Sequence, residues 1–248
     1  MKGKVALITG GTAGIGRTTA LAFAREGAQV ALSGRREKEG NEVVAEIKAA
    51  GGEAIFIKTD IAIDAEVNAM VEQTVAAFGR LDYAFNNAGV EQNGTATAKQ
   101  TEEEFDRVMN TNVKGVWLSQ KYEIAAMLAS GGGAIVNNSS IAGLVGMAGM
   151  GIYIASKHAV IGLTKATALE VARKGIRVNA VAPAAIETRM FNDFAKTDEQ
   201  QKMMASLHPI GRIGKPEEIA EAVVFLCSDK ASFITGETLA IDGGWTAQ

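Results

Sequence analysis

The chain has 248 residues, of which 47% are hydrophobic and 21% charged, a balance typical of a soluble globular protein. A single cysteine excludes an intramolecular disulfide, and only two histidines are present, so we expect no metal site built on these residues. The net charge is −3 with acids and bases interspersed, and no apolar run reaches the length of a signal peptide or membrane span. We therefore expect a cytoplasmic protein that binds neither nucleic acid nor membranes.

Short apolar runs alternate with longer amphipathic stretches along the whole chain. We expect strands at Val5–Thr9, Gln29–Ser33, Ala54–Lys58, Tyr83–Asn86, Ala134–Asn138, Arg177–Val181 and Thr238–Ile241. We expect helices at Gly14–Arg25, Glu37–Ala50, Asp64–Phe78, Glu102–Leu128, Tyr153–Arg173 and Pro216–Cys227. The alternation predicts an α/β fold in one domain over residues 1–248, a Rossmann-like, doubly wound sheet of seven parallel strands with helices on both faces.

A glycine-rich turn follows the first predicted strand and precedes the first predicted helix. Its glycines are Gly10, Gly11, Gly14 and Gly16, whereas Thr19 stands where the third glycine of the standard G-x-G-x-x-G spacing would be. Glycines let the backbone approach a pyrophosphate closely, and a helix N-terminus offers free N–H groups to it. In this position the turn predicts a dinucleotide-binding site.

The end of the second predicted strand bears on which dinucleotide binds. An NAD site usually has an acidic residue there, but this strand runs into Arg35 and Arg36. Guanidinium groups suit the additional 2′-phosphate of NADP, so we favour NADP(H) over NAD(H). The alternative is a solvated arginine pair in a surface loop.

Tyr153 and Lys157 stand four positions apart in a predicted helix, so they share one face. A neighbouring ammonium lowers the pKa of a phenol, and the pair therefore predicts a general acid/base for interconverting a carbonyl and an alcohol. Ser140 follows the fifth predicted strand, at the edge where open α/β sheets bind ligands, and could hold the carbonyl oxygen. Asn112 either orders a water near the lysine or satisfies a helix irregularity.

The longest connection, at about residues 185–212, interrupts the alternation of strands and helices. Long connections of this kind often form lids over a site, and the alternative is a pair of surface helices over a satellite core. Its bulky apolar residues and its histidine are Met190, Phe191, Phe194, Met203, Met204 and His208.

Together these residues resemble the classical short-chain dehydrogenase/reductase family along essentially the whole chain. The features that carry the resemblance are the Thr9–Gly16 turn, Asp60, the Asn86–Gly89 stretch, Asn112, Ser140, the Tyr153–Lys157 stretch, Pro183, Ile186, Thr188, the Gly236–Thr238 stretch and the Asp242–Gly244 stretch. Two positions depart from the family. Ala184 follows Pro183 where glycine is frequent, and Ala13 provides no basic residue in the glycine turn.

The resemblance implies a catalytic tetrad and a homotetramer. Tyr153 would exchange the proton, Ser140 would orient the carbonyl, Lys157 would lower the tyrosine pKa and bind ribose, and Asn112 would hold a relay water. The residues expected to bind the cofactor are Gly10, Thr12, Gly14, Ile15, Gly16, Ser33, Arg35, Arg36, Asp60, Ile61, Asn87, Ala88, Gly89, Tyr153, Lys157, Pro183, Ile186 and Thr188.

We therefore expect hydride transfer between NADP(H) and a moderately apolar ketone or secondary alcohol. One alternative is a 3-ketoacyl-(acyl-carrier-protein) reductase, whose carrier would need a basic docking patch such as Lys114, Lys121, Arg173 and Lys174. Another is a dinucleotide-binding regulator that does not catalyse, although all four residues of the tetrad are present.

Overall fold

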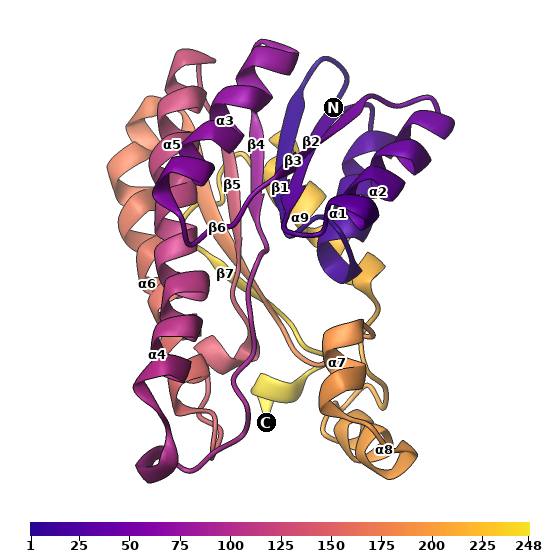
Figure 1. Ribbon diagram of the computed structural model, residues 1–248, viewed down its shortest axis with the longest axis vertical. Helices are drawn as coiled ribbons and strands as arrows, with labels where there is room; N and C mark the ends of the chain where they lie inside the picture. The colour runs from indigo at the N-terminus through magenta and orange to yellow at the C-terminus, as the bar shows by residue number, and fades with distance from the viewer.

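The computed structural model describes residues 1–193 and 195–248 of the chain. Seven strands form one parallel sheet in the order β3-β2-β1-β4-β5-β6-β7 (Figure 1). Their bounds are β1 (Val5–Thr9), β2 (Gln29–Gly34), β3 (Ala54–Lys58), β4 (Tyr83–Asn86), β5 (Gly133–Asn138), β6 (Ile176–Pro183) and β7 (Thr238–Ile241). The predicted doubly wound sheet is confirmed.

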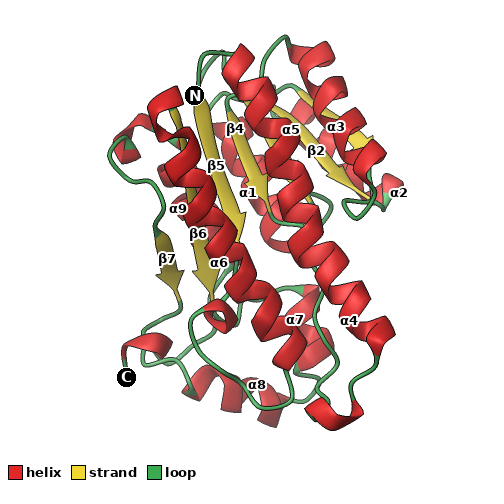
Figure 2. Ribbon diagram, turned by 90° about the vertical axis from the view of Figure 1, so that its left-hand side faces the viewer, coloured by secondary structure: helices red, strands yellow, loops and turns green.

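Helices cover both faces of the sheet and bury its apolar side chains (Figures 1 and 2). One face carries α1 (Gly14–Arg25), α2 (Glu37–Ala49) and α9 (Pro216–Cys227). The other carries α3 (Asp64–Phe78), α5 (Gly115–Ala129) and α6 (Gly151–Val171). Because both faces are covered, every residue of β1 is buried, which explains its continuous apolar sequence.

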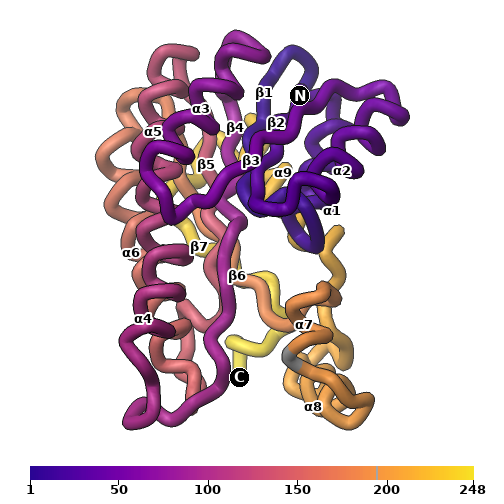
Figure 3. Tube along the Cα trace, in the orientation of Figure 1, coloured from indigo at the N-terminus to yellow at the C-terminus, as the bar shows by residue number. Residues whose placement is uncertain are grey.

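The strand order reverses at β1, which pairs with β2 on one side and β4 on the other. Such a switch point leaves a crevice at the carboxyl ends of the strands, where open α/β sheets bind ligands. The labelled strand arrows of Figure 2 point toward the end of the molecule that contains α7 (Arg189–Phe194) and α8 (Asp198–Ser206). The chain trace in Figure 3 places the C-terminus at this same end.

The segment predicted as a helix over Glu102–Leu128 is helical, but it contains a π-helical turn that the sequence did not predict. The segment consists of α4 (Glu102–Met109), a π-helical turn (Asn110–Lys114) and α5. Gly115 N–H donates to the Asn110 carbonyl five positions earlier, and such a wider turn re-aims the side chains within it. Apolar periodicity does not reveal one extra residue in a turn. The other predicted bounds differ from the observed ones by at most two residues.

The segment at residues 185–212 contains both α7 and α8. A capping box between Thr197 and Gln200 begins α8 and explains why a helix starts there. Phe191 is buried whereas Met203 is exposed, so the apolar residues of the segment do not share one environment. Phe194 lies outside the described residues. In the described part of the chain, no helix is long and apolar enough to span a membrane.

Candidate active site

A cavity of about 700 Å³ lies at the carboxyl ends of the central strands. This volume is within the range of ligand-binding sites in proteins. One end is bordered by Arg35, Arg36 and Asp60, and the other by Tyr153 and Lys157. The predicted site residues that line it are Gly10, Thr12, Gly14, Ile15, Arg35, Arg36, Asp60, Ile61, Asn87, Ala88, Gly89, Ser140, Tyr153, Lys157, Pro183, Ile186 and Thr188.

The glycine turn packs so closely that side chains would not fit in it. Gly10 has a φ of 65°, and a Cβ there would lie 2.9 Å from the Ala88 Cα. A Cβ at Gly16 would collide with the carbonyl oxygen of Gly10. The N-cap residue of α1 is Ala13, whose side chain satisfies none of the free N–H groups. Bare N–H groups at a helix start, bordered by an open cavity, fit a pyrophosphate.

The arginines after β2 border the cavity beside the glycine turn. Arg36 donates a hydrogen bond to the Thr12 hydroxyl at 2.8 Å, and Arg35 lies 3.9 Å from the Asp60 carboxylate. The Arg36 guanidinium therefore remains beside the glycine turn, and that of Arg35 beside the segment after β3. Ser33, which was predicted to bind the cofactor, is fully buried beneath this surface and is not among the cavity-lining residues.

A chain of hydrogen bonds connects the glycine turn to the chemical end of the cavity, where Tyr153 and Lys157 lie. The Asn87 amide donates to the carbonyls of Thr9 and Gly10, at 3.1 and 3.2 Å. The Asn138 amide donates to the Asn87 side-chain oxygen at 3.0 Å, and the Asn138 carbonyl accepts from Lys157 Nζ at 2.8 Å. The lysine is thus held by the same network that shapes the turn.

Ser140 and Tyr153 come together from different elements, as the sequence predicted. The Ser140 hydroxyl accepts from the Ala142 N–H at 3.1 Å and donates to the Pro183 carbonyl at 3.4 Å. Tyr153 lies in the first turn of α6, and the Ser140 hydroxyl is close enough to act on its phenol. The serine, the tyrosine and the lysine therefore share one corner of the cavity.

Burial is the largest influence on the pKa of Tyr153 in this structure, and the effect of Lys157 on it stays a prediction. Burial raises the pKa of Tyr153 above its ordinary value, and the charge of Glu91 raises it further, whereas the Ser140 hydroxyl acts in the opposite direction. Lys157 Nζ lies 5.6 Å from the ring centroid, and burial lowers the pKa of Lys157 itself to about 8. Burial is thus the first cause of the pKa shift in both groups.

Asn112 is buried in the π-helical turn and does not line the cavity. Its side-chain oxygen accepts from the Val90 N–H at 2.8 Å, and its amide donates to the Val90 carbonyl at 2.9 Å and to the Ser156 hydroxyl at 3.1 Å. The side chain therefore joins the segment after β4 to the helix that carries Tyr153. Asn112 thus lies within a helix irregularity, but its side chain bonds other segments, and its ordering of a water near the lysine stays a prediction.

Gln92 is a buried residue at the site that the sequence did not reveal. Its side-chain oxygen accepts from the N–H groups of Ile152 and Tyr153, both at 3.0 Å, and its amide donates to the Gly149 carbonyl at 3.2 Å. Because the N-cap residue of α6, Met150, makes no side-chain cap, Gln92 performs this role from a distant segment. No local pattern could show a cap whose partners lie about 60 positions away.

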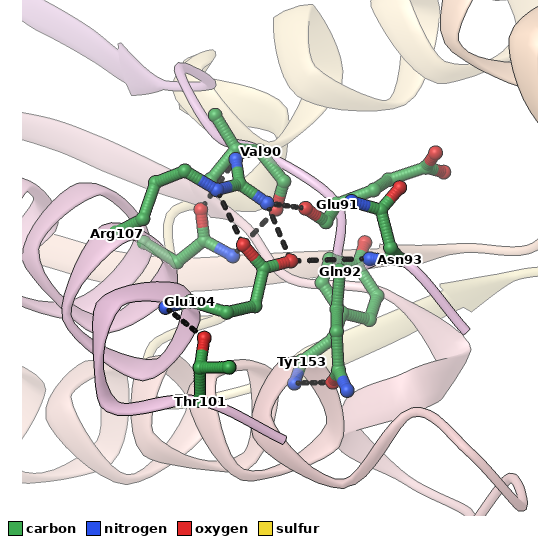
Figure 4. A network of polar contacts seen from close by, with 9 residues as sticks. Val90, Glu91, Gln92, Asn93, Thr101, Glu104, Arg107 and Tyr153 are labelled. Atoms are coloured by element: carbon green, nitrogen blue, oxygen red, sulfur yellow. Dashed lines mark hydrogen bonds and ion pairs between the residues drawn. The ribbon is translucent and has the colours of Figure 1, made fainter. Parts of the chain in front are cut away.

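Residues 90–93 form a short segment that α4 holds in place (Figure 4). Arg107 donates to the Glu91 carbonyl and also pairs with Glu104 at 2.7 Å, and Glu104 accepts from the Asn93 N–H at 3.1 Å. The Glu91 side chain lines the cavity, and burial raises its pKa to about 7. The sequence does not indicate a role for Glu91, because a single glutamate after a strand has no distinctive pattern.

Comparison with known proteins identifies the fold's relatives. A family model described as enoyl-(acyl carrier protein) reductase matches residues 10–246. The chain belongs to the short-chain dehydrogenase/reductase family. It is similar to a cyclohexanol dehydrogenase from Acinetobacter sp., with 46% identity over 99% of this chain and 96% of the relative.

Two solved structures of short-chain dehydrogenases/reductases superpose closely on this chain. A levodione reductase has a TM-score of 0.97 and 37% identity, covering 100% of this chain and 99% of the other. A 3-ketoacyl-(acyl-carrier-protein) reductase from Brucella melitensis, complexed with NADH, has a TM-score of 0.93 and 37% identity, covering 99% of each chain. The chain is accordingly an NAD(P)-dependent oxidoreductase.

Proposed function

We propose that this enzyme transfers a hydride between NADP(H) and a ketone or secondary alcohol, with Tyr153 as the general acid/base. The observation that carries the proposal is the convergence of Ser140, Tyr153 and Lys157 on one cavity that also contains the glycine turn. A bound nicotinamide dinucleotide supplies or accepts the hydride. The protein itself has to hold the carbonyl and move one proton.

Each residue of the tetrad has a role that its contacts support. The raised pKa of Tyr153 keeps its phenol protonated at neutral pH, so it is ready to donate to the carbonyl oxygen during reduction. Ser140 holds that oxygen beside the phenol. The positive charge of Lys157 stabilises the tyrosine side chain during proton transfer. Asn112 bonds Val90 and Ser156 and thereby holds α6 in place.

NADP(H) is the cofactor that the adenosine end supports best. Arg35 and Arg36 border the cavity next to Thr12, where their charge suits a 2′-phosphate. The carboxylates nearby are already engaged, since Asp60 lies 3.9 Å from Arg35 and Glu39 lies 3.8 Å from Arg36. The NADH-bound Brucella reductase shows that a relative uses the other dinucleotide, so the choice requires a direct titration.

Alicyclic ketones are the substrate class that the cavity favours. Its chemical end is lined by apolar side chains that include Met147, Met150, Met190 and Phe191. The cyclohexanol dehydrogenase relative supports a six-membered ring. A carrier-protein reductase is less well supported because Lys121, one of the candidate docking residues, is engaged by Asp64 and Tyr122.

The proposal is tested by following NADPH and NADH oxidation with cyclohexanone, acyclic ketones and a 3-ketoacyl thioester. We expect cyclohexanone to be reduced, with a lower KM for NADPH than for NADH. The double variant Arg35→Ser, Arg36→Ser should raise the KM for NADPH at least tenfold while changing that for NADH little. Tighter binding of NADH by the unmodified enzyme would overturn the NADP assignment, and exclusive reduction of the thioester would overturn the substrate class.

A further inference from the structure

The Glu91 carboxyl is a polar group in the cavity without a partner. In the described residues, no hydrogen bond or ion pair reaches its oxygens, and its pKa depends only on burial and on the charges of Asp193 and Lys157. It lies on the wall of the cavity that holds Tyr153 and Lys157. Its oxygens are therefore free to bond the water of the cavity or a ligand that displaces this water.

The backbone around Glu91 is held on both sides, which fixes the point from which its side chain enters the cavity. Arg107 holds the Glu91 carbonyl, Asn112 holds both backbone groups of Val90, and the Gln92 side chain is tied to the start of α6. In Figure 4 the Glu91 carboxyl lies on the opposite side of this segment from the Arg107–Glu104 pair. No cation of α4 therefore neutralises it.

A substrate that fills the cavity changes the surroundings of this carboxyl. The neighbouring methionines and Phe191 offer it no hydrogen bond, and the substrate displaces the water that otherwise would. A simple ketone does not replace that water, because its single oxygen is held by Ser140 and Tyr153. A substrate with a second hydroxyl replaces it.

Resting on the proposed function, we propose that Glu91 is a specificity-determining residue that accepts a hydrogen bond from a second hydroxyl of the substrate. The preferred substrates are then hydroxylated alicyclic ketones and the corresponding diols. An uncharged hydroxyl fits better than an amine because Lys157 already brings a positive charge to this corner. Sites built to bind a substrate hydroxyl strongly reject analogues that lack it.

The test compares 4-hydroxycyclohexanone with cyclohexanone, using NADPH and the unmodified enzyme, Glu91→Gln, Glu91→Met and Glu199→Gln. We expect the unmodified enzyme to favour the hydroxyketone by at least about tenfold in kcat/KM. Glu91→Met should reduce this ratio to about one, whereas Glu91→Gln, which keeps an acceptor, should retain most of it. Glu199 is an exposed acid of α8 outside the cavity, and its variant should leave the ratio unchanged.

The outcomes separate this inference from the proposed function. Equal losses on both ketones in Glu91→Met, with the ratio intact, would overturn the inference and leave hydride transfer standing. If the enzyme preferred 4-aminocyclohexanone and Glu91→Gln removed that preference, Glu91 would bind a cation rather than a hydroxyl. That result would overturn the inference. If neither ketone is reduced, the proposed function fails. The role of Glu91 is then tested by calorimetry, which compares the binding of cyclohexane-1,4-diol and cyclohexanol to the NADP-bound enzyme. Equal affinities for the two alcohols would overturn the role of Glu91.

Discussion

Lys157 is buried and Tyr153 is half-buried, and the loss of water around them moves their pKa values in opposite directions. It raises that of the phenol and lowers that of the ammonium to about 8. A low-dielectric site disfavours both charged forms, so near neutral pH the tyrosine is protonated. This state suits reduction, in which the tyrosine donates a proton. Oxidation needs the phenolate and should therefore be favoured at alkaline pH.

The charge of Glu91 gives this pH dependence a specific test. The carboxylate raises the pKa of Tyr153 and that of Lys157, so its removal in Glu91→Gln should lower both. We expect the rising limb of kcat/KM for cyclohexanol oxidation to shift to lower pH. Asp193 and Ser140 are the other groups that act at this corner, and both are unchanged in the variant. A shift to higher pH would contradict the assignment, and Glu199→Gln serves as the control.

Gln92 positions Tyr153 by capping the helix that carries it. Gln92→Met should leave two buried N–H groups at the start of α6 without an acceptor, at a cost of about 1 kcal/mol or more in stability. We expect kcat to fall about tenfold or more while the KM for NADPH changes little. Gln92→Glu retains the acceptor and should restore most of kcat. Equal losses in both variants would indicate a general packing role instead.

At the scale of elements, a buried polar network joins β4, β5, α5 and α6. The Asn86 amide donates to Glu123 at 3.0 Å and to Asn137 at 3.1 Å, and the Asn137 amide donates to Thr164 at 2.9 Å. Glu123 is completely buried, and burial raises its pKa to about 8 although the Asn86 hydrogen bond opposes this. The carboxyl is therefore protonated at neutral pH.

Glu123→Gln tests the network through the pH dependence of stability. The folded state binds this proton more tightly than the unfolded state, whose carboxyl titrates at about 4.3. The stabilisation is thus complete below that pH and is lost as the pH rises to about 8. The glutamine variant should lack this decline and melt at a higher temperature than the unmodified protein at pH 8, by about 2–4 °C for each kcal/mol of stability that the glutamate loses. If the variant and the unmodified protein melted at the same temperature throughout pH 5 to 8, the prediction would be contradicted.

The elements were largely predictable from the sequence, whereas their long-range partners were not. Runs such as Val5–Thr9 are buried on both faces and so reveal themselves as strands. The order of Ser140, Tyr153 and Lys157 located the chemical end of the cavity. The π-helical turn at Asn112, the cap from Gln92 and the direction of the Tyr153 pKa depend on contacts between distant segments. Local periodicity carries no information about such contacts.

At the scale of the whole molecule, α4, α5 and α6 present a face that carries exposed apolar residues. Phe105, Trp117 and Leu169 are each at least 47% exposed, which is unusual for large apolar side chains on neighbouring helices. Figure 2 shows these helices side by side. Together with the family expectation, this supports assembly into a homotetramer through that face.

Light scattering tests the assembly. The unmodified protein should have four times the mass of a 25.9 kDa chain. Trp117→Glu and Leu169→Glu should each give a smaller species, because a buried unpaired carboxylate opposes association. Met203→Glu, at an exposed residue of α8 on the other side of the molecule from α4, α5 and α6 in Figure 1, should leave the mass unchanged. A monomeric unmodified protein would contradict the prediction.

The central role of Tyr153 is tested most directly by Tyr153→Phe, which removes only the phenolic oxygen. We expect kcat for NADPH-dependent reduction of cyclohexanone to fall by about 10²–10⁴, the usual contribution of a general acid. NADPH binding, followed by its fluorescence, should change less than about threefold. Tyr122→Phe loses an exposed phenol that contacts Asp64 and should retain full activity. A Tyr153→Phe enzyme that keeps a tenth or more of the original kcat would contradict proton transfer by this residue.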